Sequence, residues 1–501
     1  MCNVYLFGLK QKILYLQPIF FKKLKIPSMS NLVKVLKKFP RIFWVSNVME
    51  LFERWAWYGL YNSLALYLTL SKESGALGFT QVQKGTIMGT GTMLLYFLPL
   101  ITGAISDRIG YKKVLILSFT MYIGGYIMLG TFESYSLVFA SYIFLATAGA
   151  LFKPIISGMI AKTTDEETSS VGFGIFYMMV NIGGFIGPFI AGFVYKVSWN
   201  YVFAISVVTI AVNYIFIFFF FKEPYRNPSD NSFFQNIKEA FKNIVVTLIN
   251  WKYVVFLLIM SLFWTAFNQL YYTFPVFLEQ WVDLDKISAF LGMSPGKITA
   301  VTVMSMDAFY IIVLMLYISS VSMRFKPLTS MITGTVILGV GLILMFLTRN
   351  PWIVLFGVLV FAIGEMASSP KYTEYVGRIA PPDKKALYMG TSFLPVALGH
   401  FLTGWISGRP FEVVADKLFL LKKAVAENGF SIPDISDNFT QTQYFESAEK
   451  LFGMDSVALS NHLWVTYSPY HVWYQYAALA FTAALLLFVY DRFILSSKTD
   501  N

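Results

Sequence analysis

Apolar runs of about 20 residues recur from one end of the chain to the other, separated by shorter polar segments. As a helix, a run of this length crosses about 30 Å of hydrocarbon. The runs are continuous rather than alternating, which excludes the strands of an outer-membrane barrel. Within lipid, helices are then the structure that satisfies every backbone polar group. The pattern predicts an all-α membrane protein with about twelve transmembrane helices.

The predicted spans form two groups of six around a polar stretch, residues 222–252, that contains Pro224 and Pro228. The spans are 43–70, 85–106, 113–131, 136–161, 172–194, 201–221, 253–276, 298–322, 329–348, 352–372, 386–408 and 473–495. We therefore divide the chain into a basic leader (1–42), an N-terminal six-helix bundle (43–221), a linker (222–252) and a C-terminal six-helix bundle (253–501). Two six-span halves suggest an internal duplication, as in many secondary transporters.

The charges of the loops predict the orientation of the chain. With the amino end inside, the inner loops hold most of the Lys and Arg residues, and the short outer loops carry only Lys72, Lys84, Lys196, Lys286, Lys297 and Arg349. The positive-inside rule then places both termini in the cytoplasm, as an even number of spans requires. We expect a multi-pass protein of the inner (plasma) membrane. The leader reads either as a membrane-surface helix or as a disordered segment.

A long insert, from Arg409 to Pro469, then falls outside the cell. It contains two helix-like stretches, Phe419 to Ala426 and Ser447 to Phe452, around a polar segment. It is too short and too polar to be an enzyme domain by itself, and its sequence indicates no function.

Composition removes several classes of function. Only 13% of the residues are charged, and the net charge of +11 fits basic cytoplasmic loops rather than nucleic-acid binding. A single cysteine, Cys2, excludes an internal disulfide, and three scattered histidines predict no metal site. The chain has no phosphate-binding glycine loop and no nucleophile–base pair within a span. We expect neither a primary pump nor an enzyme, and no cofactor beyond protons as the coupling ion.

Ionisable residues inside the spans are the most informative feature. Each costs at least about 2.5–3.5 kcal/mol at the centre of a membrane helix unless it is paired or faces water. The first span carries Glu50, Glu53 and Arg54, followed on the same helix face by aromatic residues at Trp57, Tyr58 and Tyr61. Such a stripe can hold protons and can bind a carboxylate through the guanidinium. The alternative is a structural ion pair that only locks helices together.

Three further ionisable residues fall within later spans. Lys153 lies in the fourth span, and its natural partners are Glu50 and Glu53. Protonation of either carboxylate would then release the lysine, although a purely structural pair is the alternative. Asp307 and Glu365, in the eighth and tenth spans, could each hold a proton or a cationic group of a solute. Asp307 could instead lie near a span end and be solvated there.

Two motifs connect these residues to a known family. Gly103, Asp107, Arg108 and Gly110 resemble the GxxxDRxGRR loop of the major facilitator superfamily. The stretch from Glu50 to Gly59 is similar to the ExxERFxYYG signature of the proton-dependent oligopeptide transporters within that superfamily. Four other stretches resemble the same transporters, and the resemblance covers about Phe43 to Gly408. These stretches are Leu151–Pro154, Phe176–Gly183, Phe263–Gln269 and Gly364–Pro370.

The resemblance implies a major facilitator fold and roles for individual residues. Glu50, Glu53, Arg54 and Lys153 would form the proton-linked network, and Arg54 and Lys153 would also face the carboxyl end of a peptide. Tyr58, Asn181 and Trp264 would line the pocket, with Trp57 and Tyr61 beside them, and Glu365 would hold the amino end. The Gly103–Gly110 loop would be a cytoplasmic charge latch.

This chain departs from the family pattern at three positions. Asn268 replaces an acid in the seventh span, Tyr61 replaces a basic residue in the first, and Asp307 replaces an asparagine in the eighth. A carboxylate could thus have moved from the seventh span to the eighth. We count Asn268 among the expected substrate-binding residues, and Asp307 among both the substrate-binding and the proton-coupling residues.

Together these observations predict a monomeric symporter that imports di- and tripeptides or related small solutes with protons. Two alternatives remain open at the level of the sequence. One is a proton symporter of the same fold for a non-peptide solute, such as an organic anion or an amino-acid conjugate. The other is a sensor that binds a nutrient without transporting it.

Overall fold

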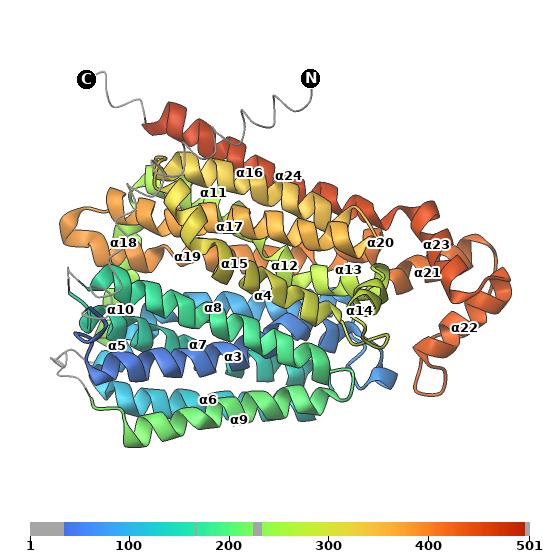
Figure 1. The fold of residues 1–501 in the computed structure, drawn as a ribbon, viewed down its shortest axis with the longest axis horizontal. Coiled ribbons are helices and arrows are strands. Elements are labelled where there is room, and N and C mark those ends of the chain that lie inside the picture. Colours follow the sequence, from blue (N-terminus) through green and yellow to red (C-terminus); the bar gives the residue numbers. More distant parts are fainter. Residues whose placement is uncertain (1–34, 166–167, 224–232, 496–501) are drawn as a thin grey trace, which may run out of the picture.

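The computed structural model describes residues 35–165, 168–223 and 233–495, and in these ranges the regular elements are helices (Figure 1). One isolated β-bridge joins Ser436 and Phe439 within the described part of the insert. Most of the predicted leader, residues 1–34, lies outside the described residues, as does part of the predicted linker, residues 224–232.

The helices of the first half follow the predicted spans to within a few residues. The second predicted span is two helices, because Pro99 begins a new helix directly after Leu98. The helices are α3 (Arg41–Thr69), α4 (Gln81–Phe97), α5 (Pro99–Ile109), α6 (Tyr111–Thr131), α7 (Tyr135–Lys162), α8 (Ser169–Val194) and α9 (Trp199–Phe219). The helix α10 (Phe233–Leu248) follows in the linker.

The second half contains the same number of spans, two of which are interrupted. The seventh is broken at Asn268 and Thr273, and the eleventh is broken at Ser392 and Phe393. The helices are α11 (Trp251–Phe267), α12 (Gln269–Tyr272), α13 (Phe274–Trp281), α14 (Asp285–Phe290), α15 (Ala300–Ser322), α16 (Pro327–Phe346), α17 (Pro351–Ile379), α18 (Lys385–Thr391), α19 (Leu394–Ile406) and α24 (Val472–Val489).

Length and apolar composition qualify 10 helices of the described chain as membrane spans. The predicted first span, α3, is long enough but carries Glu50, Glu53 and Arg54. The predicted eleventh span is divided between α18 and α19, each short on its own. With these two, the described helices make the twelve crossings of an all-α membrane protein.

Each half forms its own bundle, and the two bundles meet along two pairs of helices. In Figure 1 the first half occupies the lower part of the molecule and the second half the upper part. Helix α4 packs on α19, and α8 packs on α15. The α4–α19 contact requires glycine, since a Cβ atom added at Gly85 would lie 2.1 Å from the carbonyl oxygen of Gly404. The halves therefore touch backbone to backbone at this point.

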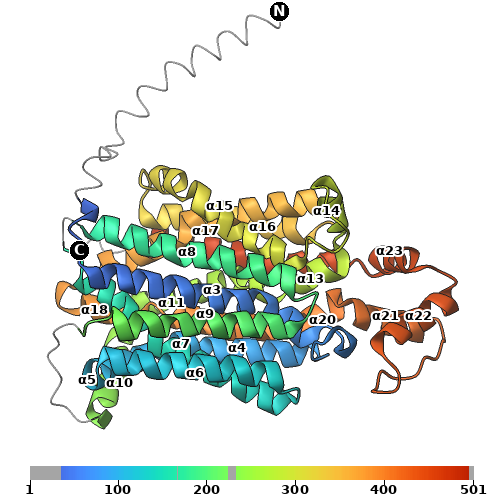
Figure 2. The same cartoon turned by 60° about the horizontal axis from the view of Figure 1, so that its bottom comes forward.

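The two ends of the molecule differ (Figures 1 and 2). The start of α3, the end of α24 and helix α10 lie together at one end, which we call the α10 end. The insert projects from the opposite end, the insert end. It contains α20 (Arg409–Ala415), α21 (Lys417–Glu427), α22 (Gln441–Phe452) and α23 (Ser456–Tyr467). The sequence predicted α21 and part of α22 but missed α23.

Candidate functional site

The predicted cluster in α3 is assembled as an ion-paired group. The Arg54 Nε lies 3.2 Å from Glu50 Oε1 and also contacts Glu53 Oε2. From α6, the hydroxyl of Tyr122 donates a hydrogen bond to Glu53, which is completely buried. Two carboxylates on the same helix thus share the guanidinium of Arg54, and the i, i+4 spacing of Glu50 and Arg54 allows this.

Arg54 keeps one nitrogen without a partner. Its Nη2 is buried and has no hydrogen-bond partner among the described residues. The guanidinium carbon lies 5.7 Å from the centre of the Tyr58 ring. Burying an unpaired donor of a charged group is expensive, and a purely structural ion pair would be expected to satisfy it. The free Nη2 therefore favours a binding role over a purely structural one.

Lys153 does not form the predicted ion pair with Glu50 or Glu53. Its ammonium lies 3.9 Å from the centre of the Tyr96 ring on α4, and no described carboxylate forms an ion pair with it. The physical reason is that Arg54, on the same helix as the two carboxylates, already occupies both. A cation over an aromatic face is a favourable alternative when water is scarce.

The residue after Lys153 removes one backbone hydrogen bond from helix α7, which nevertheless continues to Lys162. Pro154 lies inside α7 and has no N–H to give to the carbonyl of Ala150. The hydroxyl of Thr102 on α5 donates to that carbonyl instead, at 2.6 Å. Lys153 and Pro154 line a cavity of about 400 Å³ at the α10 end. Its walls come from both halves and from α10, through residues that include Tyr96, Glu239, Asn243 and Thr391.

A second, smaller cavity of about 50 Å³ lies between the halves. The first half contributes Tyr58, Asn62 and Asn181, and the second half contributes Tyr271, Asp307 and Glu365. Asp307 is only 5% exposed, so the alternative of a solvated residue at a span end is wrong. This volume is smaller than a dipeptide.

Three polar oxygens at this cavity have no hydrogen-bond partner among the described residues. They are Oδ1 of Asn62, Oδ1 of Asp307 and Oε2 of Glu365. The amide nitrogen of Asn181 does not donate to any of these oxygens, because it donates to the carbonyl of Tyr177 at 2.8 Å. The cavity is therefore rich in unused acceptors.

Five of the residues expected to bind substrate line neither cavity, and Arg54 is one of them. Trp57 stacks on Tyr61 with ring centres 5.5 Å apart, and Tyr61 lies 5.1 Å from the ring of Tyr271. Trp264 packs edge-on against Phe263 and Phe267. Asn268 ends α11 at the break in the seventh span. Tyr61 thereby packs behind Tyr271, which lines the smaller cavity, and the contact of all these side chains with a solute stays a prediction.

The structure adds residues that sequence reasoning did not select. Asn62 continues the four-residue spacing of Glu50, Arg54 and Tyr58 along α3, so its position was readable from that helix. Tyr96, Tyr122 and Tyr271 come from other helices, and no spacing along the chain connects them to Glu53, Lys153 or Tyr58.

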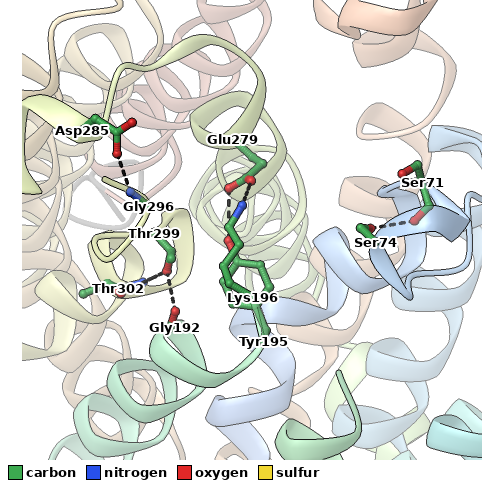
Figure 3. Close-up of polar contacts among 10 residues, drawn as sticks. All are labelled: Ser71, Ser74, Gly192, Tyr195, Lys196, Glu279, Asp285, Gly296, Thr299 and Thr302. Carbon is green, nitrogen blue, oxygen red and sulfur yellow. Dashed lines mark hydrogen bonds and ion pairs between the residues drawn. The ribbon is translucent and has the colours of Figure 1, made fainter. Parts of the chain in front are cut away.

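At the insert end the two halves are held together by polar contacts (Figure 3). From the loop between α8 and α9 in the first half, Lys196 pairs with Glu279 on α13, and Tyr195 donates to the same carboxylate at 3.1 Å. The hydroxyl of Thr299, which precedes α15, donates to the carbonyl of Gly192 at 3.0 Å. Within the first half, a turn after α3 is closed by a 2.6 Å hydrogen bond from Ser74 to Ser71.

Lys84 is not the loop residue that the predicted boundaries implied. It lies in the first turn of α4 and is 0% exposed. Its ammonium donates to Gln81 Oε1 and to the carbonyl of Tyr272, both at 2.8 Å. Tyr272 belongs to the interrupted seventh span, where the helix break leaves that carbonyl available. Lys84 therefore connects the two halves at the insert end.

The insert also joins the halves. Asp416 accepts hydrogen bonds from Gln81 of the first half at 2.8 Å and from Gln280 of the second half at 3.0 Å. Further out, Glu73 accepts from the backbone and hydroxyl of Thr442 at the start of α22. Partial burial acts to raise the pKa of Glu73, but these hydrogen bonds outweigh it and lower that pKa.

The predicted latch motif occupies the second half of α5 and Gly110, at the α10 end. Gly110 has φ = 111°, a conformation that glycine adopts without strain, and it separates α5 from α6. The side chain of Asp107 lies outside the described residues. Glu223, which the sequence did not single out, accepts from the N–H groups of Tyr111 at 2.7 Å and Lys112 at 2.9 Å. A carboxylate at a helix N-terminus is stabilised by the helix dipole.

The described residues contain no group of three or more His, Cys, Asp or Glu side chains that could hold a metal ion. The polar groups of the site can bind protons and charged organic groups instead. Donors lie on the first half, at Arg54 and Lys153, and acidic acceptors lie on the second half, at Asp307 and Glu365.

Comparison with known proteins agrees with this architecture. The profile of the Major Facilitator Superfamily matches residues 48–404. The chain is 22% identical to the uncharacterized MFS-type transporter YqjV of Bacillus subtilis over 380 residues, which is 75% of this chain and 88% of that protein. It is 27% identical to dipeptide and tripeptide permease A of Escherichia coli over 240 residues. That match spans 46% of this chain and only 45% of the permease.

Solved structures of similar fold cover most of the chain. A POT family transporter in complex with 5-aminolevulinic acid has a TM-score of 0.66 and 17% sequence identity, over 91% of this chain and 99% of the other. A POT family transporter in complex with a thioalcohol-conjugated peptide has a TM-score of 0.67 at the same identity and coverage. At this identity the likeness establishes the fold.

Proposed function

The chain belongs to the Major Facilitator Superfamily, and from this premise we propose that it imports di- and tripeptides, or related small solutes, together with protons. Family and fold are those of transporters. Transport would proceed by alternating access, in which the two halves rock around a site between them. Both halves of the site belong to one chain, which supports a monomer as the working unit.

The separation of charge across the site is the observation that carries this proposal. Arg54 has a free guanidinium nitrogen on the first half, and Asp307 and Glu365 have free carboxyl oxygens on the second. Tyr58 connects them, because its ring lies beside Arg54 and also lines the cavity of the two acids. A peptide has a carboxylate at one end and an ammonium at the other, and it would bridge the two halves in this direction.

Glu50 and Glu53 supply the proposed coupling step. In the structure both contact Arg54. Protonation of either carboxyl weakens its contact with the guanidinium, which then becomes available to the carboxylate of a solute. A proton and a solute would thereby bind together. The membrane potential adds about 2.3 kcal/mol per charge per 100 mV.

The conformation supports import toward the α10 end. At the insert end the halves are joined by Lys84, Lys196 and the insert, and the cavity that Lys153 lines lies at the α10 end. A separate cavity of about 640 Å³ lies at the insert end, between the insert and the segment before α4. We assign the α10 end to the cytoplasm of a cell with this protein in its inner (plasma) membrane, in agreement with the basic loops on that side. The structure would then be an inward-facing state.

Uptake into proteoliposomes tests this function. Purified protein should accumulate a labelled dipeptide only when an inward proton gradient is imposed, and a protonophore should abolish the accumulation. Binding without accumulation would identify a sensor and would refute the transport proposal.

A second candidate substrate is an amino-acid-like solute with separated charges, as in the similar structure that holds 5-aminolevulinic acid. Such a solute should then compete with the dipeptide.

A further inference from the structure

The small cavity between the halves has an unusual balance of charge. It is lined by two carboxyl groups, Asp307 on α15 and Glu365 on α17, and its described lining includes no Lys, Arg or His. Each carboxyl has a buried oxygen without a hydrogen-bond partner. A buried carboxylate is stable only when it is paired or protonated. The charge of each carboxylate is therefore balanced either by a bound proton or by a cationic group that enters the site.

A neutral side chain beside the two acids also favours a cationic ligand. Oδ1 of Asn62 is a third acceptor without a partner, and the Asn62 side chain is only 4% exposed. Three unused acceptor oxygens in one cavity match a group that only donates hydrogen bonds. An ammonium has three such donors and a guanidinium has five. One α-ammonium would neutralise one of the two carboxylates and leave the other unpaired.

We propose, resting on the transport function above, that Asp307 makes the site select peptides with two cationic groups at the amino end, that is, with an N-terminal lysine or arginine. The α-ammonium and the side-chain cation face Glu365 and Asp307, and Asn62 accepts one of the remaining N–H groups. The site lies between helices of both halves, so it widens when the halves separate. The carboxyl end of the same peptide extends toward Arg54.

Competition for uptake tests this selectivity. Proteoliposomes with a proton gradient and a membrane potential clamped at zero receive labelled Ala-Ala and increasing amounts of unlabelled Lys-Ala, Ala-Lys or Ala-Ala. Charge-assisted hydrogen bonds predict a half-inhibitory concentration about ten-fold lower for Lys-Ala than for Ala-Ala. Ala-Lys carries its extra cation at the carboxyl end, so its half-inhibitory concentration should be close to that of Ala-Ala.

Two variants assign the effect to the carboxylate. In Asp307→Asn, the half-inhibitory concentration of Ala-Ala divided by that of Lys-Ala should fall to about one. In Asp307→Glu, which keeps a carboxylate, this ratio should stay near ten. The ratio is informative even when the absolute rate changes. If Asp307→Asn shows no uptake, thermal shifts with the same two peptides measure the ratio by binding.

The outcomes separate this inference from the proposed function. Absence of Ala-Ala uptake by the unaltered protein would refute the peptide transport proposal itself. Uptake of Ala-Ala with equal competition by Lys-Ala would leave transport intact and overturn the inference, since Asp307 would then carry a proton rather than a substrate charge. An equal gain from Ala-Lys, or a preference retained in Asp307→Asn, would also overturn it.

Discussion

Glu73 and Thr442, which belong to opposite halves of the chain, are joined at the insert end by two hydrogen bonds. The backbone N–H of Thr442 donates to Glu73 Oε2 at 3.2 Å, and the Thr442 hydroxyl donates to the same oxygen at 2.5 Å. The N–H of Gln441 donates to the other oxygen at 2.9 Å. The carboxylate thus holds the first turn of α22, and alternating access must break this contact whenever the insert end opens.

We predict that Glu73→Ala releases α22. The N–H groups of Gln441 and Thr442 lose their acceptor, so their hydrogen exchange should become faster, as should that of the first turn of α22. Hydrogen–deuterium exchange with mass spectrometry measures this directly. Lys72→Met is the matched control, because the Lys72–Asp437 pair is 3.3 Å long but largely exposed and should matter little. Equal exchange in both variants would contradict the anchoring role of Glu73.

We predict that Glu53→Gln abolishes accumulation against a gradient. The amide cannot take up a proton, so the contact with Arg54 no longer responds to the gradient. Exchange of labelled for unlabelled peptide across the membrane, which needs no net proton movement, should persist. Tyr122→Phe removes only the hydrogen bond to Glu53 and should have a milder effect. Normal concentrative uptake by Glu53→Gln would refute the coupling role.

We predict that Lys84→Met lowers the thermal midpoint more than Lys196→Met. Both lysines link the two halves, but Lys84 is fully buried, whereas the side chain of Lys196 is 44% exposed. Without Lys84, the carbonyl of Tyr272 and the amide oxygen of Gln81 lose a donor in a buried site. Such orphaned groups cost about 1–3 kcal/mol each. A thermal-shift assay in one detergent compares the variants, and equal midpoints would contradict the assignment.

We predict a pH-dependent contribution from Lys417 in the insert. Its ammonium lies 5.6 Å from the centre of the Trp281 ring. Burial, together with the charge of Arg349, lowers the pKa of Lys417 from 10.5 to about 8. Between these two values the unfolded protein binds more protons than the folded protein, so stability rises with pH across that window.

Lys417→Met removes this dependence. The variant should be more stable than the unaltered protein at pH 7, by at most about 3 kcal/mol. The difference should shrink as the pH rises from 8 to 10, because the folded protein then holds a neutral amine. Thermal midpoints at several pH values measure it. A variant that is less stable at pH 7 would show that the charge of Lys417 is favourably paired.

The order and limits of the membrane helices were predictable from the sequence. Hydrophobic length located ten of the described spans, since a helix in lipid needs about 20 apolar residues. The cluster of Glu50, Glu53 and Arg54 was also predictable, because residues one turn apart on a helix must be neighbours. One boundary error had a consequence. The sequence placed Lys84 in a loop because it is charged, whereas the structure places it inside α4 with the carbonyl of Tyr272 as its partner.

Contacts between helices could not be read in the same way. The sequence offered two carboxylates as partners for Lys153, but Arg54 occupies both and leaves Lys153 over Tyr96. The sequence also indicated that Asp307 and Glu365 were unusual, yet not that they line one cavity with Asn62. The sequence of the insert also did not indicate that its helix α22 contacts Glu73 of the first half.

The sequence by itself thus determined which segments cross the membrane and which of them carry charge, because the bilayer acts on each helix separately through its length and polarity. The tertiary structure decided which charges are paired, which are left free in the cavity, and where polar contacts join the halves. These properties depend on side chains from distant segments meeting at a few ångströms, and neither hydrophobic length nor helical spacing specifies that meeting.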